Sequence, residues 1–492
     1  MRKAGILMHI SSLPSPYGIG SYGQSAYDFV DFLHEAKQTY WQILPLGPTS
    51  FGDSPYQTFS AFANNPYFID LDLLIKDGLL MKNEARTTGS NPLSVDYEKL
   101  YQERFKILKK AFLRFDLDDP LYQMFLKEES FWLEDYALFM AIKHAHGGKS
   151  LLYWGEHIRL RDKDTMAHFK AQLKDEVDFH KFMQYEASKQ YQALKLYANA
   201  RGVGIIGDMP IYVSYDSSDV WAHPEMFNLD EQHIPNEVAG VPPDSYSKDG
   251  QLWGNPLYDW DYMKKHGFDW WIERVRYSAK LFDMVRIDHF IGFVNYFAIK
   301  YGEKTAVKGV WKQGPADDLF EAIKHAIKDV HIIAEDLGVV TPKVRATLVK
   351  AGFPGMKLLQ FAFDSRESSE YLPHFYEKNV IVYTGTHDNM TSTSWFKSLP
   401  KADLAYCLEY INHCSGNQVD SLIKATLGCV ADTAIIPIQD YLHLGDEGRM
   451  NTPSTLGSNW MWRVDQTALT KALNDKIRSF TTLYGRSPDH VK

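Results

Sequence analysis

Acidic side chains stand at the ends of three short apolar segments. Asp288 ends DMVRID, Glu335 lies in HIIAED, and Asp388 follows VIVYTGTH. Retaining cleavage of a glycosidic bond uses one ionised carboxylate as nucleophile and one protonated carboxylic acid that protonates the leaving oxygen. A single aspartate after a strand is also a common helix N-cap. Three such positions, each flanked by Arg, His or Gly, favour the catalytic interpretation.

The sequence neighbours of two of these acids suggest different roles. Arg286 is two residues before Asp288, so strand alternation puts both side chains on one face. A guanidinium favours the ionised form of a nearby carboxylate, which suits a nucleophile. Glu335 has no basic neighbour and follows two isoleucines, so a raised pKa and an acid/base role are expected.

His387 and Asp388 are adjacent and would diverge on a continuing strand. Both can face a substrate only if the strand has already ended near Thr386. Asp208, in the third apolar segment, and Asp364, just after the sixth, are expected to add to the ring of acids.

Eight apolar segments of this kind predict the strands that must position the acids. Near-continuous apolar strings are typical of parallel strands covered on both faces. Helical periodicity lies between several of them, at 27–36, 268–280, 318–328 and 342–350. This alternation predicts an α/β fold, a (β/α)8 TIM barrel whose mouth collects the strand ends; a doubly wound open sheet is the alternative. The predicted strands are 5–10, 40–46, 204–211, 283–288, 331–336, 357–363, 380–386 and 434–439.

The uneven spacing of the strands predicts two insertions into one catalytic unit that spans residues 1–492. Between the second and third strands, residues 50–202 are expected to form a largely helical subdomain. Between the third and fourth strands, residues 212–268 are expected to form a long loop region over the active site. The helices predicted in the first insertion are 97–115, 131–146 and 179–201.

Composition and charge exclude several classes of protein. Hydrophobic residues make up 45% and charged residues 23% of the 492 positions, as in ordinary globular proteins. Lys and Arg number 53 against 62 Asp and Glu, and this acidic balance argues against a nucleic-acid partner. No apolar run is long enough for a signal peptide or a membrane span. The three cysteines are an odd number and show no C-x-x-C spacing, so neither a disulfide framework nor a metal site is expected. Together these features predict a cytoplasmic protein.

No cofactor or metal is expected from the motifs. Gly18, Gly20 and Gly23 match G-x-G-x-x-G, but the next strand lacks the acidic residue that would bind a ribose, and the following helix begins without a basic residue. The histidines show no spacing that would close a metal site.

The sequence resembles the 4-α-glucanotransferases of the amylomaltase type, glycoside hydrolase family 77 of the α-amylase clan. The resemblance runs from residue 9 to residue 463. It implies Asp288 as nucleophile, Glu335 as general acid/base, and Asp388 as a third carboxylate that holds sugar hydroxyls. The matching stretches are HISSLPSPYGIGSYG, DSPYQTFSAFANNPYFIDL, IIGDMPIYV, GVPPDSYSKDGQLWGNPLYDW, VRIDHFIGF, AEDLGVVTP, YTGTHDN and GSNWMWR.

The resemblance also implies a set of substrate-binding residues and a flexible loop, 241–255, on the acceptor side. Ser454 stands where the family usually has Gly, which affects the loop near one of these residues, Asn459. The implied substrate-binding residues are Arg286, His387, Tyr56, Ser54, Asp208, Asp244, Gln251, Trp253 and Asn459.

The function implied is transfer of a segment of an α-1,4-glucan or maltooligosaccharide to the 4-hydroxyl of another glucan or of glucose. The intermediate would be a covalent glycosyl ester of Asp288. Two alternatives remain: a plain α-glucan hydrolase that uses the same residues, and a catalytically silent glucan-binding barrel. The silent barrel would be expected to lack at least one of the three acids, and all are present.

Overall fold

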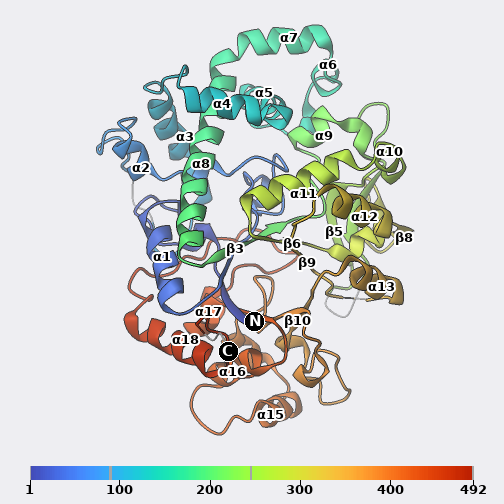
Figure 1. The fold of residues 1–492 in the computed structure, drawn as a ribbon. Helices are drawn as coiled ribbons and strands as arrows, with labels where there is room; N and C mark the ends of the chain where they lie inside the picture. The colour runs from blue at the N-terminus through green and yellow to red at the C-terminus, as the bar shows by residue number, and fades with distance from the viewer. Residues whose placement is uncertain (1, 88–90, 244–246, 339, 490–492) are drawn as a thin grey trace.

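Eight parallel strands form the barrel predicted from the apolar segments (Figure 1). The computed structural model describes residues 2–87, 91–243, 247–338 and 340–489. The strand order around the sheet is β10-β11-β12-β1-β2-β3-β6-β9. Each predicted segment contains or overlaps one strand: β1 (Lys3–Leu7), β2 (Tyr40–Gln42), β3 (Gly204–Met209), β6 (Met284–Ile287), β9 (Ile332–Ala334), β10 (Gly355–Leu358), β11 (Val380–Tyr383) and β12 (Thr433–Pro437).

The junction between β9 and β10 closes the barrel differently from the others. Here the regular ladder is interrupted, although the Ala334 N–H still donates to the Pro354 carbonyl at 2.9 Å. A side chain supplies a second link, because the Met356 N–H donates to Asp336 Oδ1 at 2.7 Å. Asp336, which follows Glu335 in the sequence, is therefore engaged in closing the barrel.

Helices cover the outside of the barrel. Four of them lie where periodicity predicted a helix: α1 (Gln24–Glu35), α11 (Asp269–Leu281), α12 (Ala316–Ala326) and α13 (Pro342–Ala351). α16 (Gln418–Gly428) and α18 (Lys471–Leu483) were not predicted. α13 shows the local reasons for its limits. Thr341 caps its first turn, Pro342 occupies the first helical position, and Gly352 ends it with a left-handed φ of 73°.

The helical insertion lies at one side of the barrel, at the top of Figure 1. It holds a separate cluster of buried aromatic side chains that includes Trp132, Tyr136 and Phe139. Four of the helices described there, α2, α4, α6 and α7, were not predicted. Whether it is an independent subdomain with limits at 50 and 202 stays a prediction. Its helices are α2 (Leu71–Lys76), α3 (Tyr97–Phe112), α4 (Pro120–Glu128), α5 (Ser130–Ala145), α6 (Glu156–Arg159), α7 (Lys163–Gln172) and α8 (Lys174–Ala200).

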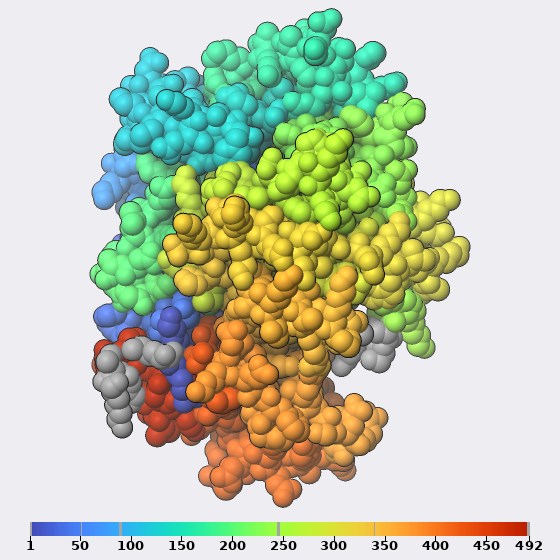
Figure 2. Space-filling view, turned by 45° about the vertical axis from the view of Figure 1, so that its right-hand side comes forward, coloured from blue at the N-terminus to red at the C-terminus, as the bar shows by residue number. Residues whose placement is uncertain are grey.

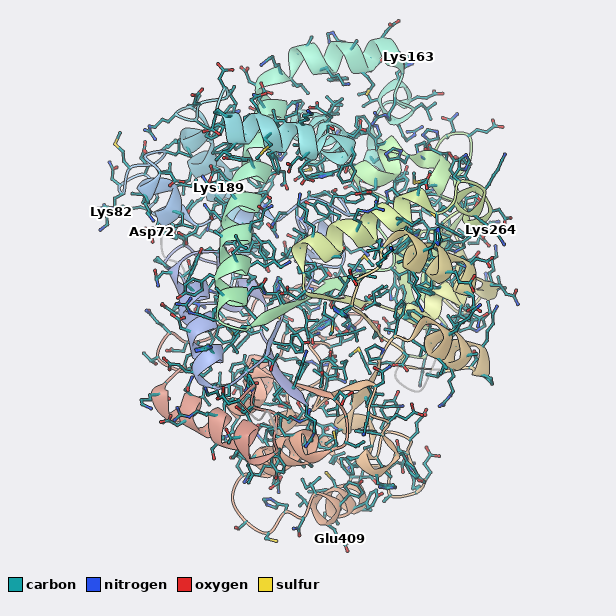
Figure 3. The ribbon with its side chains drawn as sticks, in the orientation of Figure 1. Asp72, Lys82, Lys163, Lys189, Lys264 and Glu409 are labelled. Atoms are coloured by element: carbon teal, nitrogen blue, oxygen red, sulfur yellow. The ribbon has the colours of Figure 1, made fainter. Side chains whose placement is uncertain are left out.

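A second, antiparallel sheet was not expected from the sequence. β4 (Glu237–Val241) and β5 (Gln251–Pro256) come from the region predicted as a loop, and β7 (Asn295–Lys300) and β8 (Val310–Gln313) follow the fourth barrel strand. The sheet order is β5-β4-β7-β8. Figure 2 shows the segment near residue 300, in yellow, projecting at the surface. The labelled charged residues Lys163, Lys264 and Glu409 lie at the periphery (Figure 3).

Candidate active site

A single guanidinium gathers three carboxylates at the barrel mouth. Arg286 Nη1 donates to Asp208 Oδ2 at 2.6 Å and to Asp288 Oδ1 at 3.1 Å. Its Nη2 lies 3.6 Å from Glu335 Oε2. Asp208 and Arg286 are paired across β3 and β6, so their side chains share one face of the sheet. Arg286 is therefore the electrostatic centre of the cluster.

The main chain holds the two principal acids just beyond their strands. The Asp288 N–H donates to the Met209 carbonyl at 3.0 Å, and the Glu335 N–H donates to the Ile287 carbonyl at 3.0 Å. Each acid thus adds one backbone hydrogen bond to the pairing of its strand with the neighbouring strand, just after the strand ends. Their positions relative to each other are therefore set by the barrel backbone.

Glu335 is tuned toward the protonated state. Burial raises its pKa to about 8, and the negative charges of Asp288 and Asp388 act in the same direction. The Arg286 guanidinium and the His289 N–H, which donates to Oε2 at 2.6 Å, oppose the rise without cancelling it. The direction is the one expected from the apolar sequence before Glu335, and it leaves this carboxyl protonated at neutral pH.

Asp208 and Tyr56 form a buried wall beside Arg286. The Tyr56 hydroxyl donates to Asp208 Oδ2 at 2.8 Å, and its ring stacks on the His387 ring with centroids 5.3 Å apart. Burial raises the pKa of Asp208 to about 6, although Arg286 lowers it. Among the described residues, Asp208 Oδ1 has no hydrogen-bond partner. Tyr56 comes from the helical insertion, which therefore contributes directly to the site.

The loop after β11 presents His387 and Asp388 together. β11 ends at Tyr383, before Thr386, so the condition set from the sequence is met. His387 Nε2 lies 3.2 Å from Asp388 Oδ2. Burial acts to raise the pKa of Asp388, but His387 and the Asn451 amide outweigh it and lower the pKa to about 2. At neutral pH, Asp388 is therefore ionised and Glu335 is protonated.

Comparison with known proteins identifies the family. The family model described as 4-alpha-glucanotransferase, Glyco_hydro_77, matches residues 8–469. The chain belongs to this family. A 4-alpha-glucanotransferase of Clostridium butyricum is 48% identical over 485 residues, 97% of this chain and all of the relative. That of Thermus thermophilus is 46% identical over 476 residues, 94% of this chain and 95% of the relative.

Solved structures agree with this family and with the barrel. Amylomaltase from Streptococcus agalactiae, in complex with acarbose, superposes with a TM-score of 0.97 at 43% identity and covers 99% of this chain and 100% of that one. Amylomaltase from Corynebacterium glutamicum shares the fold at a TM-score of 0.77 and 16% identity, over 99% of this chain and 75% of that one. The expected enzyme class, a 4-alpha-glucanotransferase, is confirmed.

Several residues expected in the enzyme's site lie beside the cluster rather than within it. Ser54 Oγ accepts from the Tyr56 N–H at 3.2 Å and so shapes the turn that presents Tyr56. Trp253 packs edge-on against the His289 ring at 4.9 Å, and its indole N–H donates to Gln251 Oε1 at 3.1 Å. Asp244 lies outside the described residues.

Two residues, Asp364 and Asn459, have different partners from those expected from the sequence. Asp364 pairs with exposed Arg366 at 2.6 Å, and none of its hydrogen bonds reaches the cluster within the described ranges. Asn459 is engaged inside its own loop: Oδ1 accepts from the Thr452 N–H at 2.9 Å, and Nδ2 donates to the Thr455 carbonyl at 2.9 Å. Asp364 was therefore wrongly added to the ring of acids, and Asn459 shapes a loop at the site.

Sequence reasoning missed Asn451, which donates to Asp388 Oδ1 at 2.6 Å. Its only signal was its place after the eighth strand, on the same side of the barrel as the other strand ends. Across the part of the chain that the structure describes, no group of three or more His, Cys, Asp or Glu side chains has the arrangement of a metal site. In that part too, no helix has the length and apolarity needed to cross a bilayer.

Proposed function

We propose that the enzyme transfers part of an α-1,4-glucan or maltooligosaccharide to the 4-hydroxyl of another glucan or of glucose, through a glycosyl ester of Asp288. Asp288 attacks the anomeric carbon while Glu335 gives its proton to the leaving glycosidic oxygen. Glu335, now ionised, takes the proton of the acceptor 4-hydroxyl as that oxygen displaces Asp288. Each displacement inverts the anomeric carbon, so the α configuration is retained.

The observation that carries this proposal is the sharing of Arg286 by Asp288 and Glu335, at 3.1 Å and 3.6 Å. Two carboxylates on one guanidinium suit the short separation of about 5–5.5 Å that retaining enzymes use. Their environments also differ, since burial raises the pKa of Glu335 to about 8. A nucleophile and an acid are distinguished by this kind of difference in environment.

The remaining residues are proposed to bind the sugar at the cleavage point. Ionised Asp388 accepts hydrogen bonds from ring hydroxyls, which strengthen in the distorted transition state. Asp208, whose side chain is buried behind Arg286 and Tyr56, is proposed to support this sugar site through those two residues. Arg286, His387 and Tyr56 complete this sugar site, and Gln251 and Trp253 belong to the acceptor side.

Transfer also requires discrimination against water. Water outnumbers a millimolar acceptor by about four decades, so acceptor binding must contribute roughly 5–6 kcal/mol. An aromatic wall that binds a sugar ring and excludes water fits this demand. Trp253, packed on His289 next to Asp288, is the described residue best placed to form it.

We also propose a cytoplasmic location. Cys407, Cys414 and Cys429 are all free thiols, the state that a reducing compartment maintains. Fractionation of source cells into cytoplasmic and exported proteins tests the location, and recovery in the exported fraction would contradict it.

Incubation of the purified enzyme with maltotriose alone, followed by mass spectrometry, tests the reaction. A ladder of longer oligosaccharides with free glucose and a constant number of reducing ends is expected. Rising reducing ends with only glucose and maltose would identify a hydrolase instead, and unchanged maltotriose would identify a silent binder. Asp288→Asn serves as the control, because a ladder made by that variant would exclude Asp288 as nucleophile.

A further inference from the structure

Each oxygen of the Asp388 carboxylate has a nitrogen atom nearby, one from each of two loops. His387 Nε2, from the same loop, lies 3.2 Å from Oδ2. Asn451 Nδ2, from the loop that follows β12, donates to Oδ1 at 2.6 Å. The hydrogen bond from Asn451 and the nearby His387 ring together restrict the rotation of this carboxylate.

Asn451 is itself fixed against the Asp388 loop. Its N–H donates to the His387 carbonyl at 3.1 Å. Arg449 links both loops, because Nε donates to the Asn451 carbonyl at 2.9 Å and Nη2 donates to the Asp388 carbonyl at 3.3 Å. Three hydrogen bonds to main-chain carbonyls thus hold the Asn451 loop against the Asp388 loop. Only the N–H₂ end of the Asn451 amide can face a negative oxygen.

We propose that Asn451 is a positioning residue for the transfer reaction: it orients the Asp388 carboxylate and keeps it ionised for the sugar hydroxyls. The inference rests on the proposed role of Asp388. A neutral donor suits this position, because it stabilises the charge of Asp388 without neutralising it.

Asn451→Asp separates this role from a merely structural one. The new carboxylate would lie against Asp388, and such a pair retains a proton to a higher pH than either acid alone. While it holds that proton, Asp at 451 can donate as Asn does; once the proton is lost, the two charges repel and displace Asp388. The groups that already act on Asp388 are common to both proteins: His387, Arg449, Arg286, Glu335 and Tyr56.

The experiment measures kcat/KM for maltotriose transfer by N451D and by the wild type between about pH 5.5 and about pH 7.5. The ratio of the two values is expected to fall by at least about tenfold as the pH rises across this range. Ser454→Asp is the matched control: it adds the same charge to an exposed site of the same loop, at a φ of 63° that Asp tolerates. Its ratio to the wild type is expected to stay constant.

A ratio for N451D that does not change with pH would overturn the inference, whether the activity is full or uniformly reduced. Asn451→Ala gives a second measurement if N451D does not fold: kcat is expected to fall about ten- to a hundredfold at an unchanged thermal midpoint, and full activity would overturn the inference. Asp388→Asn is assayed alongside. If D388N keeps wild-type activity, the role of Asp388 itself fails; if D388N is inactive and N451D follows the wild type, only the role of Asn451 fails.

Discussion

Glu335 shows how a single residue couples activity to stability. Its carboxyl is buried, shares Arg286 with Asp288, and has a pKa of about 8 against an ordinary value of 4.5. Between these two pH values the folded protein binds a proton that the unfolded chain has lost. Folding stability therefore decreases as the pH rises from about 4.5 to about 8. The same proton is the one proposed to be delivered to the leaving oxygen.

Glu335→Gln is expected to lower transfer activity by about 100- to 10,000-fold, since a general acid contributes a factor of that order. The variant has no proton to lose at this position. Its thermal midpoint, relative to the wild type, is therefore expected to rise with pH between about 5 and about 8. Differential scanning calorimetry at several pH values measures this, and a difference that stays constant with pH would contradict a raised pKa.

The wild-type pH profile follows from the same group. Because Glu335 must be protonated for the first displacement, kcat/KM is expected to fall as the pH passes about 8, the pKa that burial produces. Initial rates on maltotriose in overlapping buffers measure the profile. A profile that stays flat well above pH 8 would assign the proton transfer to another group.

At the scale of elements, a buried carboxylate organises the chain around the β11 loop. Asp440, in α17 (Ile438–Tyr441), accepts from Thr384 Oγ1 at 2.6 Å, from Ser392 Oγ at 2.7 Å and from the Ser392 N–H at 2.8 Å. Thr384 and Ser392 lie on either side of His387 and Asp388 in the sequence. One side chain thus fixes both ends of the loop that carries these two residues.

Asp440→Ala is expected to destabilise the fold by about 2–4 kcal/mol, because it leaves three buried donors without an acceptor. Asp440→Asn retains one oxygen acceptor and should cost less. Denaturant-induced unfolding measures both. Asp446→Ala, an exposed position nearby in the chain, is the control and should be neutral; equal stability of D440A and D446A would refute the role of Asp440.

Strands and helices could be predicted from the sequence where their own residue pattern is sufficient, without knowing which strand or helix they pack against. Apolar strings predicted every barrel strand, because a strand covered on both faces is apolar whatever it pairs with. The β4-β5-β7-β8 sheet had no such signal: β4 contains Gly240 and pairs with β7, more than fifty residues later. The three acids were recognisable from their strand ends, whereas Asn451 acts from a loop without a periodic pattern.

At the scale of the whole molecule, one arginine near the C-terminus ties the start of the chain to its end. Arg486 is fully buried and donates to the carbonyls of Lys3 at 2.9 Å, Leu427 at 2.7 Å and Ala431 at 2.9 Å. Burial lowers its pKa to about 10, so it stays charged at neutral pH. It joins β1 to the segment that enters β12.

Arg486→Ala is expected to lower the free energy of unfolding by about 3–5 kcal/mol, because several buried carbonyls lose their donor. The KM for maltotriose should not change, since the site lies at the opposite end of the strands. Arg366→Ala removes an exposed ion pair and should be nearly neutral. Thermal unfolding and steady-state kinetics test both variants, and a large change in KM for R486A with little loss of stability would contradict this role.

The junction of β9 and β10 depends on a side chain as well as on the backbone. At the other junctions the backbone ladder joins neighbouring strands, and most amino-acid replacements leave such a ladder in place. Here part of the link is the Asp336 carboxylate, next to Glu335 in the chain. A single replacement at Asp336 therefore removes a link of the barrel directly beside its general acid.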